Sequence, residues 1–335
     1  MIARRAGKRF FPCMGAAKST LTGCGLETKH RLHVRRRYVP DGCLDWRCPI
    51  GQPLISHGHS VEFLRLPGSV WRIGGDMAYE ISVNLEYAFQ DAGESIEQRI
   101  DAAAAAGFRY VELFLLKGRD LPAIREALDR NAVQLVSTVA DYATQLVDPQ
   151  THEDFCAIFR KAAQDALFLG CSNVVVTSGR AVPWLTRPVQ LRIFADALTR
   201  LLPIAEELGV TIYLESANTR HDHPGVLCST TQDSVCVVEM LSSPHVRLIY
   251  DLYHSVVEGE DPAEVMPRVM HLTDHVQIGD VPGRGEPGSG TIDWPAQLAL
   301  LKALGYKGLI GLELKPTRAP TADALSYIQQ LCDVA

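Results

Sequence analysis

The stretch HLTDHVQIGDVPGRGEPGSGTIDW, residues 271–294, joins a short apolar strand to a long loop that is rich in glycine and proline. The run 275–278 predicts the strand, and the loop after it carries Asp280, Arg284 and Glu286. A loop that only reversed the chain would not need three charged side chains between its glycines. Loops that follow buried strands are common positions for functional residues. This stretch therefore predicts a functional loop at the end of a buried strand.

The sequence on both sides of this stretch repeats one alternation of strand and helix, from Met77 onward. The expected strands are residues 81–85, 110–114, 133–139, 173–177, 210–214, 246–250, 275–278 and 309–314. The expected helices are residues 94–107, 121–130, 152–169, 188–208, 232–241, 262–269, 295–304 and 322–331. Eight short apolar strands, each followed by a helix, predict a parallel sheet closed into a (β/α)₈ barrel. A doubly wound open sheet is the alternative, but residues 84–87 lack its usual glycine-rich turn.

Residues 1–76 do not continue this alternation. They hold 13 lysines and arginines against 5 acidic residues, and they show no sustained helix or strand period. This composition fits a translated leader, a disordered basic tail or an organelle targeting segment. We therefore expect two parts, an irregular extension at 1–76 and one barrel domain at 77–335.

The barrel region is acidic, with 20 lysines and arginines against 34 acidic residues. Nucleic acid binding needs a basic face, so this balance argues against a nucleic-acid partner. No run approaches the roughly 18 apolar residues that span a bilayer, which argues against a membrane protein. The nine cysteines form no disulfide framework, which indicates a reducing, cytoplasmic location. We expect a small-molecule substrate, and a homo-oligomer stays open.

Oxygen-bearing side chains stand at the ends of four consecutive predicted strands, at Glu215, Asp251, Gln277 and Glu313. The intervals of 36, 26 and 36 residues each span one strand-helix unit, so a barrel would bring all four to one rim. Three converging carboxylates repel one another and raise one another's pKa, which a bound divalent cation would relieve. Carboxylate and amide oxygens suit Mg²⁺ or Mn²⁺, so we predict a site for one of these ions.

Four motifs resemble the xylose-isomerase-like barrels: HVQIGDVPGRGEPGSGTIDW (275–294), GLELKP (311–316), YDLYH (250–254) and LES (214–216). The resemblance covers nearly the whole chain after Met77. The VPGRGEP element, with Gln277 rather than histidine at the metal position, is similar to the hydroxypyruvate isomerase branch of that family. Two departures lie where the substrate is selected: Glu86 replaces a small polar residue, and residues 218–225 form a variant loop.

The resemblance implies a metal held by the four strand-end residues, with Glu215 and Glu313 also acting as a proton-transfer pair. It further implies that His254, Arg284 and Glu286 line the substrate pocket. A guanidinium can grip a carboxylate with two parallel hydrogen bonds, so we expect Arg284 to hold a substrate carboxylate.

The expected activity is a metal-dependent isomerisation of a small hydroxy-oxo acid, of the type that converts hydroxypyruvate to tartronate semialdehyde through an enediolate. A ketose 3-epimerase would use the same scaffold but return the proton to the same carbon. A metal-dependent abasic-site endonuclease would need histidine ligands and a basic groove. A barrel that binds without catalysing is the remaining alternative. Residues 178–180, His221 and His223 are further candidate substrate contacts.

Overall fold

The computed structural model describes residues 79–334, so the predicted extension at 1–76 lies outside the described residues and its boundary stays a prediction. The strands are β1 (Ile81–Asn84), β2 (Tyr110–Leu115), β3 (Gln134–Val139), β4 (Asn173–Val175), β5 (Thr211–Glu215), β6 (Val246–Asp251), β7 (Thr273–Ile278) and β8 (Ile310–Leu312). They pair in parallel, in sequence order, and β8 closes onto β1. The predicted (β/α)₈ barrel is confirmed.

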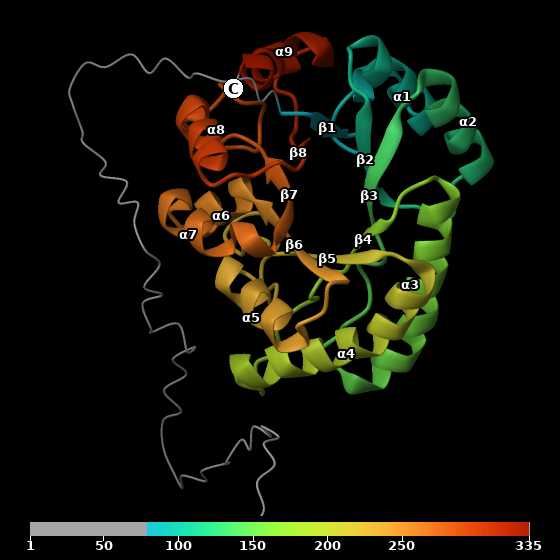
Figure 1. Cartoon of the computed structure of the whole chain (residues 1–335), viewed down its shortest axis with the longest axis vertical. Helices are drawn as coiled ribbons and strands as arrows, with labels where there is room; N and C mark the ends of the chain where they lie inside the picture. Colours follow the sequence, from blue (N-terminus) through green and yellow to red (C-terminus); the bar gives the residue numbers. More distant parts are fainter. Residues whose placement is uncertain (1–78, 335) are drawn as a thin grey trace, which may run out of the picture. The chain divides into compact units, whose positions relative to one another are not determined.

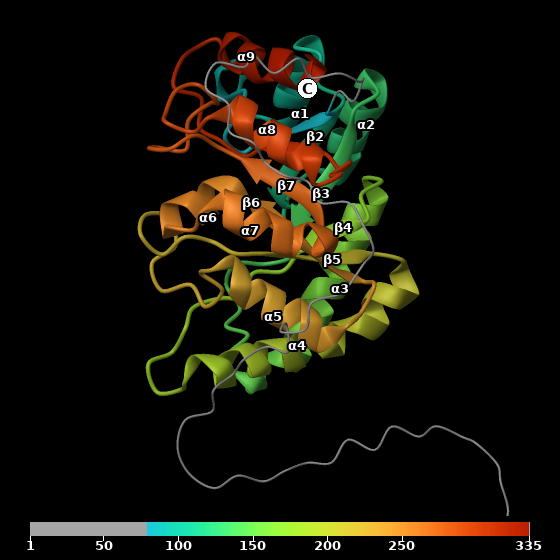
Figure 2. The same cartoon turned by 60° about the vertical axis from the view of Figure 1, so that its left-hand side comes forward.

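Helices surround this sheet on the outside (Figures 1 and 2). They are α1 (Ile96–Ala105), α2 (Leu121–Asn131), α3 (His152–Phe168), α4 (Arg187–Leu208), α5 (Thr231–Leu241), α6 (Leu252–Glu258), α7 (Pro262–Val269), α8 (Trp294–Ala303) and α9 (Thr321–Val334). Short 3₁₀ turns occur at Gln90–Ala92, Pro149–Thr151 and Met270–Leu272. None of the described helices has both the length and the apolar character that a membrane crossing requires.

Helix α6 is the one α-helix in the described range that the sequence pattern did not predict. It follows β6 without a loop, because the side chain of Asp251 caps it by accepting a hydrogen bond from the backbone N–H of His254. It ends at Gly259, which adopts a positive φ. Seven residues are too few to show a helical period, so only the cap and the glycine mark this element.

Local capping signals mark the starts of two other helices. Reciprocal capping boxes start α1 at Ser95 and α5 at Thr230. Asp91 links the first and last strand–helix units. Its carboxylate accepts hydrogen bonds from the backbone N–H and the hydroxyl of Thr321, at the start of α9. This contact joins segments separated by 230 residues, so it helps hold the first and last units together.

The strand register brings two of the predicted site residues, Asp251 and Gln277, to one level. Asp251 on β6 pairs with Gln277 on β7, and Gln277 pairs with Gly311 on β8. The main apolar core lies between the sheet and the helices, and a smaller apolar cluster that includes Tyr213 and Ile249 lies apart from it. The barrel end formed by the carboxyl ends of the strands can therefore accommodate polar side chains.

Candidate active site

A cavity of about 520 Å³ opens at the carboxyl ends of the strands. Five of the seven predicted site residues line it: Glu215, His254, Gln277, Arg284 and Glu313. Asp251 lies directly behind them, fully buried and bonded to this group. The position of the cavity agrees with the rule that barrel enzymes place their chemistry at this face.

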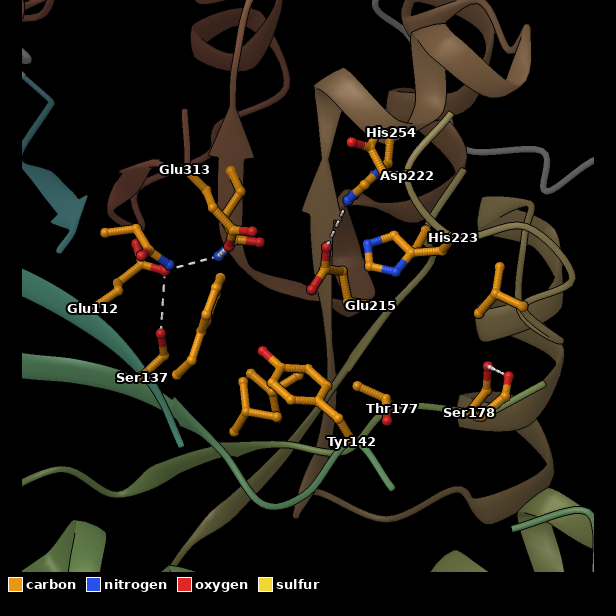
Figure 3. A pocket seen from close by; sticks show the side chains of 18 of the residues that line it. Glu112, Ser137, Tyr142, Thr177, Ser178, Glu215, Asp222, His223, His254 and Glu313 are labelled. Carbon is orange, nitrogen blue, oxygen red and sulfur yellow. Dashed lines mark hydrogen bonds and ion pairs between the residues drawn. The ribbon is translucent and has the colours of Figure 1, made fainter. Parts of the chain in front are cut away.

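The two predicted proton-transfer residues stand on different sides of the cavity. Figure 3 shows Glu313 with Glu112 on one side, and Glu215 with His254 on the other. The ring of Tyr142 lies below both groups in this view. Glu215 ends β5 and Glu313 follows β8, so the two carboxylates come from non-adjacent strands and face a common space.

A chain of polar contacts joins the predicted metal ligands. Gln277 donates a hydrogen bond from Nε2 to Oε2 of Glu313, at 2.7 Å. Arg284 Nη2 donates to Oε1 of Glu313 at 2.6 Å and to Oδ2 of Asp251 at 3.0 Å. The structure therefore brings together the side chains that the strand-end pattern predicted, with the guanidinium of Arg284 bridging two of the acids.

His254 presents an N–H group to the acids. Its Nδ1 lies 3.2 Å from the backbone nitrogen of Asn218, which can only donate, so Nδ1 accepts and the proton of a neutral ring sits on Nε2. Nε2 lies 3.5 Å from Oε1 of Glu215 and 3.7 Å from Oδ2 of Asp251. Burial, then the charge of Arg284, holds the pKa of His254 well below its usual range, so the ring is neutral at pH 7.

Burial governs the charge state of the acids around the cavity. It raises the pKa of Glu215 well above its ordinary value, and the charges of Glu313 and Asp251 raise it further. Burial also raises the pKa of Glu313 to about 7, although Arg284 acts in the opposite direction, and it raises that of Asp251. At a given pH these acids are therefore protonated to a greater extent than exposed carboxylates. A bound cation would favour their charged forms and lower their pKa.

The donor atoms fit a hard divalent cation. Oε1 of Gln277 is buried and has no hydrogen-bond partner within residues 79–334, although a buried amide oxygen normally has one. Both hydrogens of its Nε2 go to carboxylates, so the unpartnered atom is the oxygen. Ligand atoms of Glu215, Asp251 and His254 lie within 4.8 Å of one another. Since His254 offers an N–H group in this tautomer, the oxygens are the better ligands.

Arg284 is buried and is held in place by several contacts within the protein. It is 2% exposed at a φ of 60°, and Nε donates to the backbone carbonyl of Glu313 at 2.9 Å. The rings of Tyr87 and Tyr253 flank its guanidinium, with centroids 5.6 and 5.1 Å from Cζ. Within the described chain only Nη1 has no hydrogen-bond partner, so the predicted substrate contact would use Nη1 alone rather than a two-nitrogen grip.

Two acids from the functional loops point away from the cavity. Glu286 accepts hydrogen bonds from the backbone N–H and the hydroxyl of Thr317, at 2.7 and 2.8 Å, and does not line the cavity. Its predicted substrate contact stays a prediction. Glu86 accepts from the backbone N–H of Phe114 and from Arg119, at 3.1 and 2.6 Å. The unusual residue of the first turn thus links the loops after β1 and β2, and it is not among the residues that line the cavity.

Glu112, on β2, is a site residue that the strand-end pattern did not identify. Its buried carboxylate accepts hydrogen bonds from Ser82 (2.6 Å), His275 (3.0 Å), Ser137 (3.1 Å) and Gln277 (2.7 Å). Burial alone would raise its pKa, but His275 and the other donors outweigh it and lower the pKa to about 2. The sequence feature that could have identified Glu112 is its position as an acid within the apolar run YVELFL, Tyr110–Leu115.

Gly311 makes room for this buried group. A Cβ atom at this position on β8 would collide with the carboxylate of Glu112 and with the ring of His275. The backbone of β8 therefore approaches the acid directly, where any other residue would place a side chain.

The loops after β4 and β5 supply further lining residues. Residues 178–180 and His223 line the cavity, whereas His221 does not. Asp222 also lines it, and its Oδ2 accepts a hydrogen bond from the hydroxyl of Tyr253 at 2.8 Å. The variant loop 218–225 thus contributes an acid and a histidine to the wall of the cavity.

Residues 100–331 match the family described as the xylose isomerase-like TIM barrel. The match covers more than half of the chain, and the chain therefore belongs to this family. A protein from Streptomyces coelicolor named "Putative hydroxypyruvate isomerase" is 30% identical over 267 residues, 74% of this chain and 94% of that protein. A protein from Cupriavidus necator named "2-oxo-tetronate isomerase" is 30% identical over 252 residues, 73% of this chain and 93% of that protein. The predicted family and isomerase class are confirmed.

Solved structures share the fold. An AP endonuclease, family 2, from Brucella melitensis superposes with a TM-score of 0.68 at 25% identity, covering 75% of this chain and 98% of that chain. The IOLI protein, described with a binding zinc atom, superposes with a TM-score of 0.61 at 20% identity, covering 76% of this chain and 95% of that chain. The second likeness shows the fold alone.

Proposed function

We propose that this protein is a divalent-metal-dependent isomerase that moves a carbonyl group between adjacent carbons of a small 2-oxo acid, as in the conversion of hydroxypyruvate to tartronate semialdehyde. The placement of Glu215 and Glu313 on different sides of one cavity carries the proposal, because such a transfer needs a proton removed from one carbon and returned to its neighbour. The names of the two curated relatives support the same reaction type.

The site residues have different roles in this isomerisation. One of the two glutamates takes the proton from the carbon next to the carbonyl, and the other completes its delivery to the adjacent carbon. The Nε2–H of His254 donates a hydrogen bond to a substrate oxygen as charge develops there. A divalent cation held by Glu215, Asp251, Gln277 and Glu313 would stabilise the negative charge of the enediolate.

Substitution of each glutamate by glutamine tests this assignment. Glu215→Gln and Glu313→Gln keep the size and one coordinating oxygen but remove the basic group, so turnover of hydroxypyruvate should fall by roughly 10²- to 10⁴-fold. Glu86→Gln is the matched control, because Glu86 lies outside the cavity, and it should keep normal turnover. Full turnover by both cavity variants would show that the base lies elsewhere.

Deuterium incorporation distinguishes removal of the substrate proton from its delivery to the neighbouring carbon. In heavy water, the wild-type protein should place deuterium on the carbon that receives the proton, unless the transfer is internal and shielded. A Glu313→Gln protein that abstracts but cannot deliver would exchange the substrate proton without forming product. If Glu215→Gln instead exchanged the substrate proton without forming product, Glu313 would be the group that abstracts the proton and Glu215 the group that delivers it.

A ketose 3-epimerase is the second candidate, because the cavity is large enough to accept its substrate. A volume of about 520 Å³ is ample for a six-carbon sugar, since pockets for drug-sized ligands span about 300–1,000 Å³. An assay of hydroxypyruvate, tartronate semialdehyde and a set of ketoses decides between the two. Metal identity, cytoplasmic location, oligomeric state and the lack of a nucleic-acid partner stay predictions from the sequence.

A further inference from the structure

Arg180 is an exposed cation at the rim of the cavity. It follows β4, which lies opposite β8 in the closed barrel, and it lines the cavity. Its Nη2 donates a hydrogen bond to the backbone carbonyl of Pro224, another lining residue, at 3.0 Å. Within residues 79–334 it forms no ion pair, which leaves most of its five N–H groups available to a ligand.

Hydrogen bonds between loops fix the backbone of Arg180. Its N–H donates to Oε1 of Gln145, in the loop after β3, at 3.0 Å. Arg180 also forms an antiparallel bridge with Val226, in the loop after β5. On either side of it, backbone N–H groups donate across the same pair of loops, from Leu227 to Gly179 at 2.9 Å and from Ala181 to Gly225 at 2.8 Å. The position of this cation is therefore built into three adjacent loops.

The remaining charges around the cavity favour a free cation for an acidic substrate. Glu112 and Asp222 line the cavity without being proposed metal ligands, and their negative charges would repel a carboxylate group. Arg284, the other arginine among the described lining residues, already bonds to two acids. A substrate carboxylate would gain most next to Arg180.

The volume of the cavity allows more than a three-carbon substrate. Liquid water takes up about 30 Å³ per molecule, so about 520 Å³ would hold many waters beside a three-carbon acid. Thr177, Gln145 and His223 also line the cavity and offer polar groups that could bond to hydroxyls. The space suits an acid with a hydroxylated chain.

We propose that Arg180 binds the carboxylate of the substrate, and that this contact lets the site discriminate hydroxylated 2-oxo acids from neutral ketoses. This inference rests on the proposed isomerase function, because it places the reacting carbons between Glu215 and Glu313. Arg180 then acts as a specificity-determining residue. The sequence favoured Arg284, in the loop after β7, for the carboxylate contact, whereas this inference assigns the contact to the loop after β4.

Kinetics of the metal-loaded full-length protein test the proposal. Arg180→Gln should raise KM for 2-oxo-tetronate by about 10- to 100-fold, as expected for loss of a charged hydrogen bond, with a smaller change in kcat. Turnover of erythrulose, a neutral four-carbon ketose, should be unchanged. Arg180→Lys should restore part of the affinity. Arg109→Gln is the matched control, since Arg109 is exposed and pairs with Glu80 away from the cavity.

A binding measurement separates this inference from the proposed reaction. Calorimetry with threonate, a four-carbon hydroxy acid that lacks the carbonyl, should show binding to the wild type and at least tenfold weaker binding to Arg180→Gln. Threonate binding that depends on Arg180, without isomerisation of any acid, would overturn the proposed function but keep the carboxylate site. Equal affinity in both proteins, an unchanged KM for 2-oxo-tetronate, or no binding of threonate to the wild type would overturn the inference.

Discussion

Nε2 of Gln277 lies 2.7 Å from Oε2 of Glu112, at the centre of the barrel. This contact and the equal one to Glu313 use both hydrogens of the amide, which leaves Oε1 as the only atom of the group without a partner in the described chain. Glu112 therefore helps to fix the orientation of this amide. Because Gln277 is a proposed metal ligand, the acid that orients it is expected to matter almost as much as the ligand itself.

Replacing Glu112 by glutamine should weaken metal binding. The new amide can accept with one atom only, and its own NH₂ group would face donors such as Gln277 or His275. We expect a loss of about 10- to 100-fold in Mn²⁺ affinity, measured by calorimetry. Glu86→Gln should keep wild-type affinity. Normal Mn²⁺ binding by Glu112→Gln would show that Gln277 is oriented without Glu112 or is not a ligand.

Asp251→Asn should lower metal affinity more strongly, because a neutral amide replaces a charged ligand. The fold should survive, since asparagine caps helices as well as aspartate does and can still accept the backbone N–H of His254. Circular dichroism should therefore give a normal spectrum, while calorimetry detects little Mn²⁺ binding. Wild-type affinity in this variant would remove Asp251 from the ligand set.

Asp280 should make stability depend on pH. Burial raises its pKa, but hydrogen bonds from Trp294 and from the backbone of Ile292 and Gly288 outweigh burial and hold the pKa below its ordinary value of 3.8. A group with a lowered folded pKa stabilises the protein above its unfolded pKa, and that contribution disappears as the pH falls towards the folded value. Asp280→Asn should therefore be less stable than wild type at pH 7.

Urea unfolding at several pH values measures this effect. The difference in unfolding free energy between wild type and Asp280→Asn should be about 1–3 kcal/mol at pH 7, the usual cost of disturbing a buried hydrogen-bonded group. It should shrink as the pH falls below about 4. A difference that stays constant down to pH 3 would mean that the charge of Asp280 contributes nothing.

Residues 1–76 should be dispensable for folding of the barrel, because their basic composition and lack of period set them apart from Met77 onward. A protein that consists of residues 77–335 should be soluble and melt at the same temperature as the full chain in differential scanning calorimetry. An insoluble product, or a melting temperature lower by several degrees, would contradict this.

The barrel was predictable because its signals are local. Each strand and helix shows its own period, and the repeat length alone brings Glu215, Asp251, Gln277 and Glu313 to one rim. The confirmed strands differ from the predicted ones mainly at their ends, where β4 stops at Val175.

The rest depended on contacts that no local pattern contains. Glu112 meets His275 and Gln277 across separations of 163 and 165 residues, so only the closed sheet shows that they form one group. The substrate contact expected of Arg284 stays a prediction, but no local pattern showed that its guanidinium would also bond to Asp251 and Glu313. Helix α6 was not predicted because its seven residues are too few to show a helical period.

The glycine at position 311 constrains how this barrel can evolve. Since a methyl group there would strike both Glu112 and His275, the three positions are expected to show strong epistasis. A side chain at 311 becomes tolerable only after the acid and the imidazole have been replaced by smaller residues, and those replacements in turn release Gln277. Lineages that keep this chemistry should therefore keep all three residues together, and lineages that lose one should lose the set.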